Sequence, residues 1–317
     1  MPERFMDPIL ANAIIRATEA AAIAAFDLAG RGDEQQADQA AVDAMREALN
    51  QIPMQGRIVI GEGERDEAPM LYIGEEVGTG DGPEIDIALD PLEGTTLTAK
   101  CMPNALSVLA IAPRGGMLHS PDVYMDKIAV GPGYEPGLVT LDQSPSENVL
   151  ALAKAKGVAP EEISVCILDR PRHEKIIESC RSVGARVVLI TDGDIAGVIN
   201  TTDKATGIDM YLGQGGAPEG VLAASAMKCI GGQMEGRLFF RNEDEKARAA
   251  RAGIKDFGRI YKLDEMVSLP TVFCATGVTR GGLLDGVIRK DGRVETETLI
   301  MTSYDGATRR VRTSRPL

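Results

Sequence analysis

Two stretches near the start of the chain carry apolar residues at helical spacing. Residues 8 to 29 are rich in Ala, and Ile15, Ala22 and Phe26 recur on one face, which predicts a first helix. A Gly-Arg-Gly sequence at residues 30–32 ends it. The pattern predicts a second helix from about Ala37 to Gln51.

Short apolar runs typical of strands follow, and several are separated by segments long enough for a helix. This alternation indicates a layered α/β or α+β architecture. The predicted strands are Arg57 to Ile60, Ile85 to Leu89, Leu106 to Ala112, Ile163 to Leu168, Arg186 to Ile190, Ile208 to Leu212, Arg237 to Phe240 and Thr271 to Ala275.

The chain has 317 residues, which allows one large layered domain or two tightly joined halves. A stretch rich in Gly, Pro and Ser at residues 131–146 is the best candidate boundary. We therefore expect an N-terminal half of residues 1–145 and a C-terminal half of residues 146–317. The charged segment 242–255 predicts a solvated helix or a flexible insertion.

The net charge of −13 argues against nucleic acid or an anionic membrane as the main partner, because either would be repelled at long range. An anionic metabolite remains compatible with this charge if metal ions and local cations reverse the field at one site. Five cysteines without a Cys-x-x-Cys pair fit thiols in a reducing compartment, so we expect a cytoplasmic protein. The sequence predicts neither a signal peptide nor a membrane span.

Several acidic residues stand at positions where surface residues are not expected. The predicted strand 85–89 leads into Asp90-Pro91-Leu92-Glu93-Gly94-Thr95, where a sharp turn would let the two carboxylates converge. Hard cations such as Mg²⁺ or Mn²⁺ prefer such oxygen clusters. The same residues also fit a turn that caps a following helix.

Asp38 and a second acidic loop are further candidates for metal ligands. Asp38 shares a helix face with the apolar residues Val42, Met45 and Leu49, so its carboxylate needs a partner unless it only complements the helix dipole. Four acids fall within residues 61–67, directly after the strand that ends at Ile60. This loop is either part of a metal site or a solvated turn.

Two motifs in the C-terminal half suggest anion binding. Residues 213–220, Gly-Gln-Gly-Gly-Ala-Pro-Glu-Gly, are expected to form a loop that opens a helix and offers the amides of Gly215 and Gly216 to an anion. A plain helix start is the alternative. Arg170 and Arg172 follow another strand and can hold a phosphate or simply neutralise nearby acids.

With these motifs in view, the chain closely resembles class II fructose-1,6-bisphosphatase of the GlpX type, over nearly its whole length. The Asp-Pro-Leu-Glu-Gly-Thr block is also similar to the signature of the inositol-monophosphatase and lithium-sensitive phosphatase superfamily. The resemblance rests on Gly30-Arg31-Gly32-Asp33, Ala37-Asp38, residues 59–64, residues 66–75, residues 90–95, Asn104-Ala105-Leu106, residues 121–125, Pro171-Arg172-His173, Asp192-Gly193-Asp194 and residues 215–220.

The resemblance implies the sugar-phosphatase fold of alternating helix and sheet layers, and a site with two or more Mg²⁺ or Mn²⁺ ions. The metal ligands that it implies are Asp38, Glu62, Asp90, Glu93 and Glu219. The substrate contacts that it implies are Glu93, Gly94, Thr95, Tyr124, Arg170, Arg172, Asp192, Gly193, Asp194 and Gly216.

We therefore expect a metal-dependent enzyme that hydrolyses the 1-phosphate of fructose 1,6-bisphosphate by in-line attack of water. Thr95 would position this water, and Glu62 or Asp66 would take its proton. The resemblance leads us to expect a homo-oligomer, a dimer or a tetramer. Sedoheptulose 1,7-bisphosphate is a rival or additional substrate, and a protein that binds metal or sugar phosphate without catalysis is the rival from another class.

Overall fold

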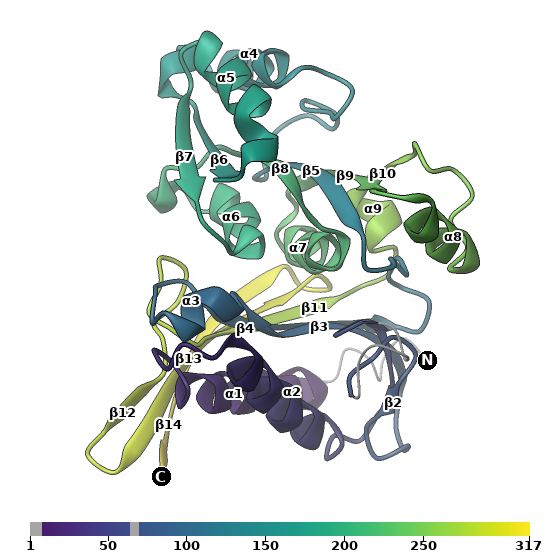
Figure 1. The fold of residues 1–317 in the computed structure, drawn as a ribbon, viewed down its shortest axis with the longest axis vertical. Helices are drawn as coiled ribbons and strands as arrows, with labels where there is room; N and C mark the ends of the chain where they lie inside the picture. The colour runs from purple at the N-terminus through teal and green to yellow at the C-terminus, as the bar shows by residue number, and fades with distance from the viewer. Residues whose placement is uncertain (1–7, 64–69) are drawn as a thin grey trace. The chain divides into compact units, whose positions relative to one another are not determined.

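The computed structural model describes residues 8–63 and 70–317, which form two compact units (Figure 1). Unit 1 comprises residues 1–118 and 269–317, and unit 2 comprises residues 119–268. The chain therefore leaves the first unit once and returns to it. The boundary expected near residue 145 falls inside unit 2, between a strand and a helix, because the Gly- and Pro-rich stretch there is a loop within one unit.

Unit 1 is built on an eight-stranded sheet in the order β12-β13-β11-β4-β3-β1-β2, with β14 paired to β13. Helices α1 and α2 cover one face of this sheet (Figure 1). The elements are α1 Pro8–Phe26, α2 Glu34–Leu49, β1 Gln55–Ile60, β2 Glu76–Val77, β3 Glu84–Glu93, α3 Thr95–Ala99, β4 Leu106–Pro113, β11 Val272–Gly277, β12 Ile288–Lys290, β13 Arg293–Thr302 and β14 Ala307–Pro316.

Helix α1 is long and apolar enough to cross a membrane by length and composition alone, with a mean hydropathy of 1.5 over Ile9–Phe26. It packs instead on β11, β4 and β13 as a core helix. Ile14, Ala17 and Ala21 are completely buried against the sheet. The small Ala side chains let the helix approach the strands and α2 closely, which accounts for the Ala-rich first segment.

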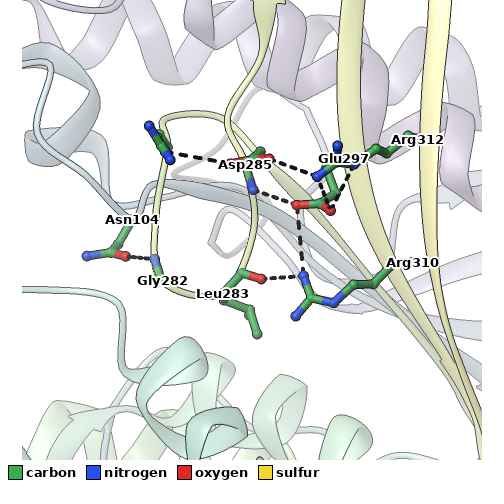
Figure 2. Close-up of polar contacts among 8 residues, drawn as sticks. Asn104, Gly282, Leu283, Asp285, Glu297, Arg310 and Arg312 are labelled. Atoms are coloured by element: carbon green, nitrogen blue, oxygen red, sulfur yellow. Dashed lines mark hydrogen bonds and ion pairs between the residues drawn. The ribbon is translucent and has the colours of Figure 1, made fainter. Parts of the chain in front are cut away.

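A polar network fixes the segment that follows β11 in unit 1 (Figure 2). The amide of Gly282 donates to Asn104 Oδ1 over 2.8 Å. Arg310 on β14 donates to the carbonyl of Leu283 over 2.7 Å, and Arg312 bonds Asp285 over 3.0 Å. The arginines of this exposed strand therefore have a structural use, because they hold a neighbouring turn against the sheet.

Unit 2 is built on a six-stranded sheet in the order β10-β9-β5-β8-β6-β7. Alternate residues face two helical layers. Val165 and Ile167 pack in a cluster with α4 and α5, while the Sγ of Cys166 faces α6. The elements are β5 Tyr124–Val130, α4 Pro145–Lys156, η2 Pro160–Glu162, β6 Ser164–Leu168, η3 Pro171–His173, α5 Glu174–Ser182, β7 Arg186–Ile190, α6 Asp194–Ile199, η4 Asn200–Thr202, η5 Lys204–Thr206, β8 Met210–Gly216, α7 Ala217–Ile230, β9 Gln233–Phe239, α8 Glu243–Arg251, β10 Ile260–Lys262 and α9 Leu263–Met266.

The mixed α/β content and two sheets confirm the layered architecture, and a strand stands at each of the eight apolar runs. Two predicted turns are wrong. Strand β3 continues through Pro91 to Glu93 instead of ending at Leu89. Strand β8 runs through the glycines to Gly216, so helix α7 starts directly after it and no loop separates them. The charged segment 242–255 contains the helix α8.

His173 ties two parallel strands together in unit 2. Its side chain is completely buried, Nδ1 lies 2.7 Å from the carbonyl of Leu168, and Nε2 accepts from the amide of Gln214 over 2.9 Å. Because Nε2 is the acceptor, Nδ1 carries the proton and the ring is neutral. Burial is the largest cause that lowers the pKa of His173 from its ordinary value of 6.5.

We predict that unit 2 loses stability as the pH falls through the range just below 6.5. The unfolded chain takes up a proton there while the folded His173 resists it, so its contribution is present above pH 6.5 and is lost as the pH approaches the lowered folded pKa. Thermal unfolding at about pH 7.5 and about pH 5.5 measures this effect. The His173→Gln variant should be less stable by about 1–3 kcal/mol at the higher pH and show a smaller decline on acidification. Equal declines in both proteins would contradict this prediction.

Candidate functional site

The carboxylates of Asp90 and Glu93 are brought together by an irregularity in β3. In a regular strand, residues three positions apart point to opposite faces of the sheet. Here Asp90 pairs with Val108 and Glu93 pairs with Leu106, so three steps along β3 match two steps along β4. The extra residue is a β-bulge, and it turns both acids to one side. A carboxylate oxygen of Asp90 and one of Glu93 lie within 4.8 Å of each other.

Gly94 and Thr95 continue directly from this pair of acids. Gly94 has a φ of +93°, a conformation that L side chains rarely adopt, and it forms the N-cap of the short helix α3. Thr95 is the first residue of α3 and is half-buried. The strand end and the glycine thus place Thr95, a residue with a hydroxyl group, two positions after Glu93 at the start of α3.

Glu62 lies at the same edge of the sheet. Strands β1 and β3 are parallel, and Ile60 pairs with Ala88, so Glu62 and Asp90 each stand two residues beyond this point. Glu62 is half-buried, and its amide donates to the carbonyl of Leu71 over 3.1 Å. The two acidic segments that each follow a predicted strand therefore stand at the ends of two adjacent parallel strands.

Asp38 lies on α2, the helix that packs against β3 and α3. It is half-buried beside the buried residues Ala37, Ala41 and Val42. Desolvation by burial raises the pKa of Asp38 above its ordinary value of 3.8. Asp38 and Glu62 stand outside the close pair formed by Asp90 and Glu93.

The donor set of unit 1 fits a hard divalent cation. Two carboxylates share a confined position, and a partly desolvated Asp38 gains from a nearby positive charge. The described residues contribute oxygen ligands here and no cysteine or histidine, which suits Mg²⁺ or Mn²⁺ better than zinc. Asp66, the other acid predicted to act in catalysis, lies outside the described residues.

In unit 2 the predicted substrate contacts gather at one edge of the sheet. Strands β6, β7 and β8 are parallel, so their carboxyl ends share this edge. Strand β5 is antiparallel to β8 and begins here, where Tyr124 pairs with Gly216. The residues that follow or end these strands are Arg170 and Arg172 after β6, Asp192, Gly193 and Asp194 after β7, and Gly216 at the end of β8.

Two guanidinium groups contact the ring of Tyr124. The Cζ atoms of Arg172 and Arg241 lie 5.1 and 4.9 Å from the centre of its ring, which is the range of cation–π contacts. Arg172 also donates through Nε and Nη2 to the carbonyl of Gln214. Arg170 is half-buried and donates to the carbonyl of Asp169 over 3.1 Å.

Arg241 is a cation of this edge that sequence reasoning missed. It stands two residues beyond β9, the strand antiparallel to β5, so it reaches the edge from the other side of Tyr124. The buried carboxylate of Glu245 accepts from Arg241 Nε over 2.6 Å and fixes it. The available signal was its position directly after the predicted strand that ends at Phe240.

The Asp192-Gly193-Asp194 block forms the start of α6. Gly193 has a φ of +82° as the N-cap, and the side chain of Asp192 accepts from the amide of Gly193 over 3.2 Å. Asp194 is buried and forms an ion pair with the buried Lys127 on β5. Sequence reasoning did not identify Lys127, because a lysine within a short segment does not indicate burial.

Glu219 lies in the first turn of α7, and its carboxylate lies so close to Gly216 that a Cβ at Gly216 would collide with it. Gly216 itself is extended, with φ −63° and ψ 145°. The two glycines therefore do not form the expected nest of alternating backbone conformations. Because Gly215 and Gly216 have no side chain, neighbouring side chains can approach the strand closely at these two positions.

Each unit thus presents a set of groups suited to one part of a phosphate ester. Unit 1 offers clustered acids and a hydroxyl, which fit a cation and the oxygen atoms that it binds. Unit 2 offers arginines, a tyrosine ring and carboxylates, which fit an anionic group and sugar hydroxyls. These two chemistries are the ones that a metal-dependent sugar-phosphate enzyme requires.

Known proteins of one family of sugar-phosphate enzymes match this chain over almost its entire length. The family of bacterial fructose-1,6-bisphosphatases that are glpX-encoded matches residues 9–315. The chain is 44% identical over 333 aligned positions to the D-fructose 1,6-bisphosphatase class 2/sedoheptulose 1,7-bisphosphatase of Synechococcus sp. (strain JA-3-3Ab), covering 97% of this chain and 96% of that protein.

A second relative comes from a different bacterium. The fructose-1,6-bisphosphatase 1 class 2 of Escherichia coli (strain K12) is 44% identical over 316 positions, which cover 95% of this chain and 94% of the relative. The family match alone covers residues 9–315 and therefore includes nearly all of both units. The chain therefore belongs to the bacterial glpX-encoded fructose-1,6-bisphosphatase family.

Proposed function

We propose that this protein hydrolyses the 1-phosphate of fructose 1,6-bisphosphate to give fructose 6-phosphate and inorganic phosphate. The observation that carries the proposal is the pair of carboxylates at the bulge of β3, followed at once by Gly94 and Thr95. Two acids held within 4.8 Å of each other suit a cation far better than solvent, and phosphate-ester hydrolysis is the chemistry that such a centre supports. The family membership supplies the substrate.

We assign the metal ligands to five acids: Asp38, Glu62, Asp90, Glu93 and Glu219. The first four belong to unit 1 and Glu219 to unit 2. Two or more Mg²⁺ or Mn²⁺ ions, when bound, neutralise phosphoryl oxygens and lower the pKa of water. The raised pKa of Asp38 supports its place in this set, because a partly desolvated carboxylate favours a neighbouring positive charge.

In this proposal Thr95 orients the attacking water through its hydroxyl, and Glu62 or Asp66 accepts the proton that the water loses. Glu93, Gly94 and Thr95 contact the reacting phosphate from consecutive positions. The left-handed backbone at Gly94 supports the assignment, since it allows α3 to begin without a gap after the acidic pair.

The other end of the substrate binds to unit 2. Arg170 and Arg172 hold the 6-phosphate, and Tyr124 packs beside it. Arg241 adds positive charge at this edge through its contact with the Tyr124 ring. Asp192, Gly193, Asp194 and Gly216 contact the sugar. Binding energy at the remote phosphate fixes the reacting end in place.

Sedoheptulose 1,7-bisphosphate is a second candidate substrate, because the names of the Synechococcus relatives include that activity. It presents the same two phosphates on a sugar one carbon longer. We propose a cytoplasmic homo-oligomer, a dimer or a tetramer, with no nucleic acid or membrane as partner. The five free cysteines support a reducing compartment, and the net charge of −13 supports the absence of polyanionic partners.

Phosphate release from a panel of sugar bisphosphates, sugar monophosphates and inositol phosphates tests the proposal. We expect release from fructose 1,6-bisphosphate with Mg²⁺ or Mn²⁺ and none with EDTA. Glu219→Gln should lose activity by about a hundredfold or more and bind Mn²⁺ more weakly in a direct titration. Release that persists in EDTA, or no release with either metal, would favour a binding protein without catalysis.

Thr95→Ala should lower kcat by roughly a hundredfold or more while Mn²⁺ binding stays unchanged, because the hydroxyl acts on water and not on the metal. Thr96→Ala is the matched control, since Thr96 is the next residue of α3 and equally half-buried. We expect the control to retain activity within a few-fold. Similar kcat values in the two variants would contradict the role of Thr95.

Arg172→Ala should raise KM for fructose 1,6-bisphosphate by about tenfold or more with a smaller effect on kcat, because the lost contact is made equally in substrate and transition state. Arg186→Ala, at the opposite end of the same parallel strands, removes the same charge from an exposed position and should leave both constants unchanged. A KM that rises equally in both variants would show that overall charge, not the contact of Arg172, is responsible.

A further inference from the structure

Lys127 is a charged side chain in the interior of unit 2. It lies on β5, between β8 and β9, and its side chain is only 1% exposed. Its neighbours Ile128 and Val130 belong to the cluster with α4 and α5. Ile128 and Val130 are one and three positions from Lys127, and residues an odd number of positions apart on a strand point to opposite faces. Lys127 therefore points to the other face of the sheet, toward α6 and α7. An ammonium group is stable in such surroundings only when acceptors surround it.

The acceptors of Lys127 come from two different elements. Its Nζ donates to Asp194 Oδ2 at the start of α6, and to the carbonyl of Gly216 over 2.9 Å at the end of β8. Both partners are positions to which substrate contacts are assigned. One buried lysine thus joins the two segments that carry those contacts.

The glycines of β8 and α7 make this arrangement sterically feasible. A Cβ at Gly215 would lie 2.9 Å from Lys127 Nζ and would collide with the Asp194 carboxylate. A Cβ at Gly220 would lie 3.4 Å from Lys127 Cδ. The glycine-rich segment therefore leaves the space through which the lysine reaches its partners.

We propose that Lys127 is a positioning residue of the sugar-phosphate site, an inference that rests on the function proposed above. It holds Asp194 through Oδ2, so that Oδ1 is the oxygen presented to a sugar hydroxyl. It also fixes the Gly216 peptide, against which the Glu219 carboxylate lies. The buried pair is neutral as a whole, so Asp194 adds no net repulsion toward an anionic substrate.

A double-mutant cycle in the full chain tests this role. We expect kcat/KM for fructose 1,6-bisphosphate to fall by about tenfold or more in Lys127→Met, in Asp194→Asn and in the double variant. The double variant should have a kcat/KM no lower than that of the less active single variant. The double variant leaves no unpaired charge in the interior, so it remains informative if Lys127→Met alone fails to fold. Losses that multiply in the double variant would overturn the proposal, as would unchanged kinetics.

Lys156→Met is the control for the loss of another lysine ion pair in unit 2. Lys156 forms an ion pair with Asp209, which stands at the amino end of β8, whereas Lys127 acts at the carboxyl end of the same strand. The control therefore removes a lysine ion pair of the same unit at the far end of β8 from the proposed sugar-phosphate site. We expect the control to keep kcat/KM within about twofold of the wild type. An equal loss in the control would assign Lys127 a purely structural role and overturn the proposal.

Amide hydrogen exchange of residues 213–220 provides a readout that does not depend on catalysis. Exchange should be faster in the double variant than in Asp194→Asn, because only the double variant loses the bond to the Gly216 carbonyl. Equal exchange in the two proteins would overturn the positioning role. A wild-type protein that releases phosphate from no sugar bisphosphate would contradict the proposed function, while the exchange measurement would still decide on Lys127.

Discussion

The repulsion between two carboxylates held at one point of a rigid sheet is the constraint on which the rest of the site depends. Asp90 and Glu93 stand at a bulge of β3, with Pro91 and Leu92 buried between them. The strand has neighbours on both sides, so its backbone cannot relax to separate the charges. Such a pair is stable when a proton or a cation neutralises it. The sheet thus holds two acids where a positive charge is favourable, before any substrate is considered.

Glu62 and Asp38 add further negative charge near the Asp90–Glu93 pair in unit 1. Glu62 stands at the end of the parallel neighbour β1, and Asp38 lies on the helix that packs against β3. Each addition increases the negative charge that a cation must offset, and burial of Asp38 increases the cost of leaving it ionised alone. In a protein with a net charge of −13, a cation at such a site would also reduce the long-range repulsion of an anionic ligand.

The sequence predicted those parts of the fold that depend on local patterns. Apolar runs located eight strands, and the Ala-rich segment located α1. Strand β14 was not predicted, because its arginines are exposed and, within the described part of the chain, β13 is its only partner strand. Strand β5 was not predicted either, because Asp126 and Lys127 interrupt its apolar pattern. In both cases pairing with a distant strand, and not the residue pattern, determines the structure.

The site was predicted to a similar extent and for similar reasons. The acids were noticeable because they follow apolar strands, and the parallel pairing of β1 with β3 explains why two of them share an edge. The bulge was not predictable, because Pro91 also fits the end of a strand. Arg241 was missed because its place at the edge depends on the order β9-β5-β8, which no local pattern encodes.

The glycine run of residues 213–220 shows most clearly where local reasoning fails. Consecutive glycines usually indicate a loop, because they weaken a strand and contribute no side-chain packing. Here β8 keeps its strand pairing through Gly216, since β5 lies alongside it over the full length. The missing side chains at Gly215 and Gly220 are replaced by the stem and ammonium group of Lys127 and by the carboxylate of Asp194. The segment is therefore shaped first by the protein's own buried charges, and any ligand that binds at its end meets a backbone already fixed by them.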